Sequence, residues 1–340
     1  MKMKGLMAVV ALGACAPSLA VEIYNKGNTT LAIGGYVDVG VGQYFENTTE
    51  VHEVSPRLNI SGTHDLGNGV TVDAMGEWGI NFLDGGDTTF TTRLGYIGVT
   101  HEHYGRLVAG TQWSPYYDVA GVADLPIAFA NDFLYSQQGD VGSARADKML
   151  SYRKQLKVNE DLSFQVGLGW QGKQAVEDPP KDAEFDARGQ IALSTTIAGF
   201  GLGYTYSGGD VDFLGLEHDA HSHLFSAFYG TYGQGLYTAL VYGMNEYFYT
   251  RLGSTALYAD TSQYEALLAY GFENSLTLSI NYESVEDDKN NLKVYSQSAL
   301  QAEYYFHEDF AGFAAYQFDL GNDIGESEND YWTIGVRYFL

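Results

Sequence analysis

Apolar and polar residues alternate along most of the chain after residue 20, as in the stretches 70–82, 162–171 and 276–283. A period of two places the two kinds of residue on opposite faces of a β-strand. About sixteen such segments follow one another, each near the ten residues that a tilted strand needs to cross a bilayer. They begin near Leu31, Val54, Val70, Thr89, Gly105, Lys148, Asp161, Arg188, Phe200, His221, Gly235, Asp260, Ser275, Leu292, Asp309 and Asp330.

The connections between these segments alternate in length. Every second one is short, as at 65–69 and 102–105, whereas the intervening ones are longer and often acidic, as at 208–220 and 321–330. Short turns at one rim and long loops at the other predict an all-β fold, a transmembrane antiparallel β-barrel of about 16 strands. A soluble β-sandwich would also alternate, but here Tyr, Trp and Phe edge the apolar faces. The chain also ends inside a strand, 331–340, which a closed barrel would pair with its first strand.

One connection, from Trp113 to Lys148, does not alternate and is far longer than the others. Connections of this length are usually functional or disordered. Its many Phe, Tyr, Leu, Ile and Val residues argue against disorder, so it is expected to pack against something. We interpret it as a loop folded into the lumen, where it narrows a pore. A surface lid or an ordinary long loop fits the local pattern equally well.

Residues 1–20 have the parts of an export signal: two lysines in the first four residues, an apolar core over 6–16 and a small-x-small site at 18–20. This segment is too short to span a bilayer. We therefore expect a signal peptide, 1–20, cleaved near Ala20, and a barrel domain, 21–340. Residues 12–15 resemble a lipoprotein processing site, and this alternative would leave a lipidated Cys15 at the start.

Charge and composition exclude several classes of function. Without the two signal lysines the chain keeps 16 of its 18 basic residues against 43 acidic ones, a formal charge of −27. This argues against nucleic-acid binding, which needs a positive surface. Cys15 is the only cysteine, so the mature chain can hold no disulfide or cysteine nucleophile.

Catalytic and metal-binding patterns are weak. His218, His221 and His223 lie close enough in sequence to bind a transition metal. We expect them to lie in a solvated loop without metal, since no supporting hydrogen-bond partner can be assigned to them. No nucleophile–base spacing stands out, so we predict neither an enzyme nor a cofactor.

Four stretches resemble, in their order and spacing, the general porins, the trimeric, sixteen-stranded diffusion channels of the Gram-negative outer membrane. These stretches are VEIYNK at 21–26, RLNISG at 57–62, TRLGYIG at 92–98 and LSYRK at 150–154. The long connection falls where that family has its third extracellular loop, which folds inward to form the constriction.

The resemblance implies an outer-membrane homotrimer with water-filled channels for passive diffusion of small hydrophilic solutes and ions. It also implies contacts with outer-membrane lipid and lipopolysaccharide, and assembly by the barrel-assembly machinery through the C-terminal strand. An adhesin or receptor barrel, whose surface loops bind a partner, is the alternative function.

In that family, arginines on the barrel wall face acidic residues on the constriction loop. By position the arginines correspond to Arg57, Arg93 and Arg145. Alternation agrees for the first two if Leu58 and Ile60, and Leu94 and Tyr96, face lipid. An arginine facing lipid at the midplane would cost roughly 2–4 kcal/mol. Arg145 precedes Arg153 by an even number of residues, so both are expected to face the lumen.

This chain departs from the family's pattern at several positions. Tyr36 stands where the family often has a wall lysine, and Ile127 stands where an acidic residue commonly follows Leu-Pro. Asp124 and Asp132 are therefore the expected loop carboxylates, and Tyr36 and Asp38 are expected to face the lumen. The final residue is Leu340 where the family usually has Phe.

The predicted lumen has a surplus of acid. Its wall arginines and carboxylates nearly balance, whereas the long connection and the outer loops are acidic. A low-dielectric channel lined mainly by one sign of charge concentrates the opposite ions. The sequence therefore predicts a weakly cation-preferring pore.

Overall fold

A computed structural model of the chain describes residues 20–81, 83, 89–175, 183–251, 256–326 and 329–340. Apart from Ala20, the expected signal peptide lies outside these residues. None of the helices among them has both the length and the apolar character to cross a bilayer.

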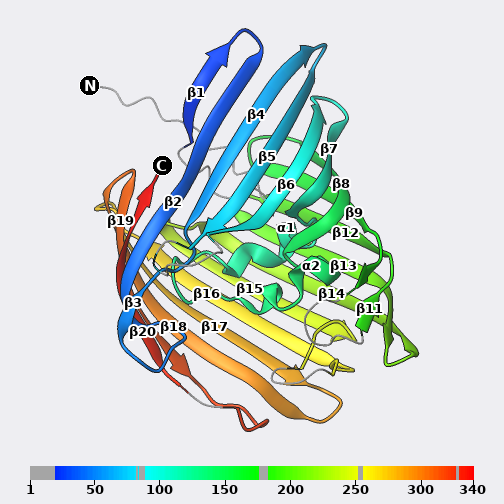
Figure 1. The fold of residues 1–340 in the computed structure, drawn as a ribbon, viewed down its shortest axis with the longest axis vertical. Coiled ribbons are helices and arrows are strands. Elements are labelled where there is room, and N and C mark those ends of the chain that lie inside the picture. Colours follow the sequence, from blue (N-terminus) through cyan, green and yellow to red (C-terminus); the bar gives the residue numbers. More distant parts are fainter. Residues whose placement is uncertain (1–19, 82, 84–88, 176–182, 252–255, 327–328) are drawn as a thin grey trace.

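Sixteen long antiparallel strands in the described part of the chain form one closed sheet (Figure 1), which confirms the predicted barrel. They are β2 (Thr29–Gln43), β4 (Arg57–Gly67), β5 (Val70–Ile80), β6 (Phe90–His101), β7 (Gly105–Trp113), β8 (Arg145–Lys157), β9 (Leu162–Gln171), β12 (Arg188–Ile197), β13 (Phe200–Phe213), β14 (Leu216–Thr231), β15 (Gln234–Glu246), β16 (Thr261–Gly271), β17 (Leu276–Asp287), β18 (Leu292–His307), β19 (Phe310–Asp319) and β20 (Tyr331–Phe339). Four short strands, β1 (Val21–Lys26), β3 (Glu50–His52), β10 (Gln174–Ala175) and β11 (Ala183–Phe185), extend the sheet at its rims.

The two ends of the chain meet along β2 and close the barrel. Strand β20 pairs with the second half of β2, from Tyr36 to Gln43, and β1 pairs with its first half, from Thr29 to Ile33. The N–H of Leu340 donates to the carbonyl of Gly35 (3.0 Å). The strands β20 and β1 therefore lie end to end in one row, and the sheet has no unpaired edge there.

Tight turns and longer loops separate to opposite rims, as predicted, with two exceptions: β17 and β18 are joined by residues 288–291 alone, and the connection between β13 and β14 is shorter still. Strands β13 and β14 are joined by only Leu214 and Gly215, whose φ angles of 56° and 77° are those of a type I′ hairpin turn. The long loop expected at 208–220 is therefore wrong. The acidic residues of this stretch belong to the two strands, with Asp212 and Glu217 exposed on one face and Val211 and Ala220 of the other face buried in an apolar cluster.

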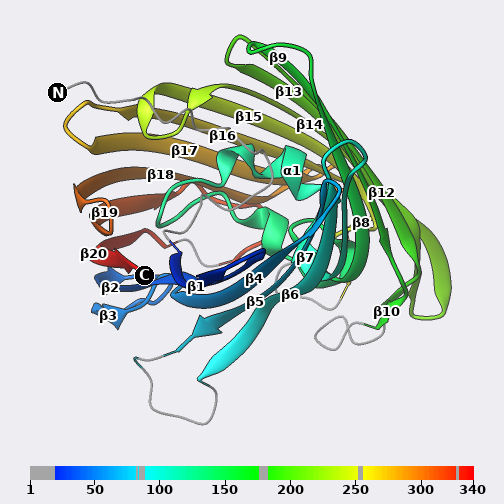
Figure 2. The same cartoon turned by 90° about the horizontal axis from the view of Figure 1, so that it is seen from above.

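The connection between β7 and β8, residues 114–144, lies inside the barrel, and we call it the inward loop (Figure 2). It contains α1 (Tyr117–Ala120), α2 (Gln138–Val141) and two 3-10 turns, η1 (Gly121–Ala123) and η2 (Phe133–Tyr135). Tyr116, Val119 and Leu134 from the loop are buried with wall residues such as Leu224 and Leu267 in one apolar cluster. This core replaces water on one side of the lumen and fixes the loop there.

Candidate pore constriction

Three arginines project from the strands nearest the inward loop. The guanidinium of Arg57, on β4, lies 4.7 Å from the ring centre of Tyr36 and donates to Ser55. Arg93, on β6, is paired with the Glu77 carboxylate at 2.9 Å. Arg145, at the start of β8, donates to the side chain of Gln138 in α2 (2.9 Å).

Arg93 reaches the lumen for a different reason from the one predicted. Leu94 lies opposite Glu77 and is 2% exposed, and the Tyr96 hydroxyl donates to the sulfur of Met75, so both residues face the lumen and not lipid. A register shift between Glu77 and Trp78 leaves Arg93 as the extra residue of a bulge. A bulge breaks strict alternation, so neighbouring side chains can share one face.

The alternation argument for Arg145 also fails. The register of β7 and β8 shifts between Gly110 and Gln112, and Lys148 has a φ of 51°. Arg153, beyond this irregularity, faces the lumen and pairs with Asp118 of α1 at 2.6 Å. Arg145 turns inward because it lies where β8 joins the inward loop, with its guanidinium over the ring of Tyr135 (5.9 Å).

Asp124 is the loop carboxylate that feels the charges of Arg57 and Arg93, without an ion pair to either within 4 Å in the described part of the chain. Its Oδ2 accepts hydrogen bonds from the hydroxyls of Tyr117 (2.6 Å) and Tyr135. Burial raises the pKa of Asp124, although these hydroxyls and the charges of Arg57 and Arg93 oppose the rise. Asp132 lies further along the loop with its side chain exposed in the lumen, where desolvation by the surrounding protein and the negative charge of Asp124 raise its pKa to about 6.

Further ion pairs line the same part of the wall. Arg337 of β20 pairs with Asp38 of β2 at 2.8 Å, and Arg106 of β7 pairs with Asp73 of β5. The guanidinium of Arg337 also lies 3.9 Å from the ring centre of Tyr36. Tyr36 therefore does not supply the positive charge of a wall lysine, but the guanidinium groups of Arg57 and Arg337 both lie against its ring.

The opposite wall, on β17 and β18, holds the backbone of the inward loop. Glu283 accepts the N–H of Phe133 (2.8 Å), and Glu303 accepts the N–H of Ile127 (3.0 Å). Gln301 accepts the N–H of Ala128 (2.7 Å), and Asn281 donates to the carbonyl of Phe129 (2.6 Å). Each of these four wall residues is at most 5% exposed, so the bonds are shielded from water.

Sequence reasoning did not give this second set of residues its role. It placed Glu283 at the end of the alternating segment 276–283, and the structure has Glu283 within β17, fully buried. The available signal was alternation, because Asn281 and Glu283 lie on the polar face of their strand. What the sequence could not give was the partner, a backbone segment about 150 residues away.

The returning part of the inward loop, which runs from α2 to β8, is bound by the wall strands β12 and β13. Three donors approach the carbonyl of Val141, at the end of α2: the side chains of Arg188 (3.5 Å), Gln190 (3.4 Å) and Ser207 (3.2 Å). Arg188 is 1% exposed. A buried guanidinium beside the carbonyl end of a helix turn has a favourable electrostatic contact.

The histidine patterns do not form a metal centre in the described part of the chain. We expected His221 and His223 to lie in a solvated loop, but both lie on β14. The two ring nitrogens of His221 lie near Asp219 (3.3 Å) and Glu246 (3.7 Å), on opposite sides of the imidazole. His223 is engaged with the Tyr204 hydroxyl (2.9 Å). The carboxylates therefore do not converge on one point with the imidazoles.

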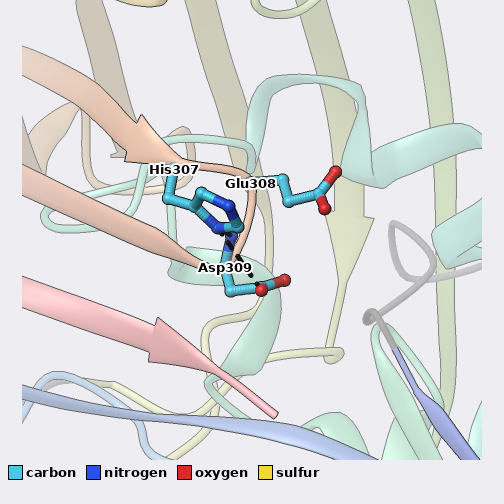
Figure 3. Close-up of side chains that lie close together, drawn as sticks. All are labelled: His307, Glu308 and Asp309. Carbon is cyan, nitrogen blue, oxygen red and sulfur yellow. Dashed lines mark hydrogen bonds and ion pairs between the residues drawn. The ribbon is translucent and has the colours of Figure 1, made fainter.

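One group of possible ligands does gather, at the short turn between β18 and β19 (Figure 3). His307 Nδ1 accepts the N–H of Asp309 (3.3 Å) and lies 3.4 Å from its carboxylate, next to Glu308. These local contacts close the turn, which explains the cluster without a metal ion.

Residues 6–340 match the family model described as "Gram-negative porin". Outer membrane porin PhoE of Enterobacter cloacae is 23% identical over 363 residues, which cover 98% of this chain and 99% of that protein. A solved Salmonella typhi OmpF in complex with daunomycin superposes with a TM-score of 0.75 at 18% identity, over 94% of this chain and 100% of that one. The trimer form of Vibrio cholerae OmpT superposes with a TM-score of 0.62 at 15% identity, over 92% and 100%. At these identities the superpositions show the fold alone.

Proposed function

This chain belongs to the Gram-negative porin family and forms a passive-diffusion channel in the outer membrane, and we propose that its inward loop is the constriction that sorts solutes. Arg57, Arg93 and Arg145 form the basic side of this constriction, and Asp124 and Asp132 its acidic side. The observation that carries the proposal is the position of Asp124, on the inward loop and within the electrostatic reach of Arg57 and Arg93.

We further propose that the pore weakly prefers cations. Arg93, Arg106, Arg153 and Arg337 each have a carboxylate partner on the wall or on α1, so much of the positive charge is neutralised locally. Within the described ranges, the loop carboxylates Asp124 and Asp132 have no Lys or Arg within 4 Å. A surplus of negative charge in a narrow channel attracts cations.

The test is the reversal potential of purified protein in a planar bilayer under a KCl gradient. We expect a potential displaced toward that of K⁺, with the displacement shrinking as salt screens the charges over ~10 Å at 0.1 M. Displacement toward Cl⁻ would contradict the selectivity proposal, because the arginines would then dominate at the constriction.

The proposal includes a homotrimer in contact with outer-membrane lipid and lipopolysaccharide. The outward face of β2 carries small and apolar residues such as Leu31, Val39 and Val41, which suits contact between flat barrel walls. The OmpT superposition offers a trimeric precedent for this fold. A monomeric mass in mild detergent before heating would exclude the trimer.

Export and assembly complete the proposal. We propose that the signal is cleaved after Ala20, because β1 begins at Val21 and continues the row of β20. The strand β20 would be the part recognised by the barrel-assembly machinery. The mass of the mature protein tests the cleavage site and distinguishes it from lipidation at Cys15.

A further inference from the structure

The connection between β15 and β16 is described over residues 247–251 and 256–260, and both of these segments turn inward at the extracellular rim. Among its described residues, Phe248 and Tyr249 are fully buried, and Leu257 and Tyr258 are 5% and 3% exposed. The N–H of Tyr258 donates to the carbonyl of Tyr249 (2.9 Å), and Thr250 forms a bridge with Leu257. The two described segments therefore pair with each other, and we call them the hairpin; their aromatic side chains are buried away from the water outside the barrel.

The hairpin packs on the inward loop at two places. The ring of Tyr249 lies 4.5 Å from that of Phe133, centre to centre, and the ring of Phe248 lies 6.1 Å from that of Tyr116. Phe133 follows the tip of the inward loop, where its N–H is held by Glu283. Tyr116 precedes α1, where its hydroxyl is bonded to Ser222 (2.8 Å). Both contacts thus fall on anchored points of the loop.

A buried arginine joins the hairpin to the wall. The guanidinium of Arg188 lies 5.4 Å from the ring centre of Phe248 and 5.1 Å from that of Phe185. The same group approaches the carbonyl of Val141 at the end of α2. One apolar cluster therefore includes the hairpin, the returning part of the inward loop and the wall. The inward loop is enclosed from the extracellular side as well as from the wall.

We propose that the hairpin is a second pore-forming element. Its Phe248 and Tyr249 are positioning residues that hold the inward loop in place and so set the width and steadiness of the channel. This inference rests on the proposed role of the inward loop as the constriction. The wall hydrogen bonds leave the extracellular side of the loop open, and the two rings occupy that side.

The experiment is single-channel recording of Phe248→Ala and Tyr249→Ala in planar bilayers. We expect a changed mean conductance and larger open-channel current fluctuations in both, because the inward loop loses packing on one side. Tyr249→Phe keeps the ring and should behave as the unaltered protein does. Tyr242→Ala is the matched control, because it removes a ring of the same size from the outward face of β15, where Tyr242 is 36% exposed.

Two outcomes separate this inference from the constriction proposal. If deleting residues 123–133 of the inward loop raises conductance while both alanine variants match Tyr242→Ala, only the proposed role of the hairpin is wrong. If neither the deletion nor the alanine variants alter conductance, the constriction proposal fails as well. A merely structural effect would lower the unfolding temperature in detergent without altering current fluctuations.

A cross-link tests the contact even if the alanine variants fold poorly. Because Cys15 is the only cysteine, Phe133→Cys combined with Tyr249→Cys supplies a unique pair after export. We expect a short bismaleimide to join them in the folded protein and to reduce the current fluctuations. Failure of this pair to cross-link in a folded barrel would overturn the proposal.

Discussion

The two sides of the lumen use charged residues differently. On the side of β2–β8, carboxylates such as Asp38 and Glu77 neutralise arginines, which keep only a small part of their side chains exposed. On the side of β16–β18, buried carboxylates such as Glu283 and Glu303 accept N–H groups of the inward loop. The first side shapes the field that a solute meets, and the second fixes the element that narrows its path.

The difference shows why residue type alone does not assign a role in a barrel. A carboxylate next to a guanidinium stays charged and tunes selectivity. A carboxylate enclosed by backbone N–H donors acts as a structural acceptor, because leaving those buried donors unbonded would cost about 1–3 kcal/mol each. Substitutions on the two sides should therefore produce different changes in conductance, selectivity and stability.

The largest change in conductance should come from removing the part of the inward loop that β17 and β18 hold. Deleting 123–133 takes away the part of the inward loop that crosses the lumen. We expect single-channel conductance to rise by more than in any point variant, while the heat-modifiable electrophoretic shift of a folded barrel is retained. Unchanged conductance in a folded variant would place the loop outside the ion path.

Breaking one anchor should loosen the loop without removing it. Glu283→Ala leaves the N–H of Phe133 without its acceptor, at a cost of about 1–3 kcal/mol. We expect larger current fluctuations and a lower unfolding temperature, with Glu283→Gln nearer to the unaltered protein because its amide oxygen can still accept. Glu286→Ala, on the same strand but partly exposed, is the matched control and should change neither quantity.

The arginine side should respond in selectivity more than in loop position. Arg57→Ser and Arg93→Ser each remove a positive charge near Asp124, so both should widen the pore and strengthen cation preference in reversal-potential measurements. Arg93→Ser also strands a buried carboxylate, Glu77, and breaking such a pair costs about 3–5 kcal/mol. An unfolding temperature of Arg93→Ser equal to that of the unaltered protein would contradict this cost.

The smallest effect should be a dependence of selectivity on pH. The pKa of Asp132 is raised to about 6, so its carboxylate is charged above that pH and takes up a proton below it. The lumen thus loses negative charge as the pH falls through about 6, and cation preference should weaken there. Asp132→Asn should remove this step in the reversal potential, and persistence of the step would assign it to another group.

The sequence by itself determined the barrel, because alternation and connection length are local properties of a chain that must bury apolar faces in lipid and bond every backbone group. It also indicated that the segment after Trp113 packs against something and that Arg57 faces the lumen, while the position of that segment inside the barrel came from the family resemblance and the structure. Alternation failed for Arg93 and Arg145, because bulges at β5–β6 and β7–β8 shift the register. The residue pattern did not predict these bulges. Only the tertiary structure decided that Glu283 and Glu303 hold the loop backbone and that Tyr249 meets Phe133. Those contacts join residues more than 100 positions apart, and their energies depend on burial that exists only once the barrel has closed.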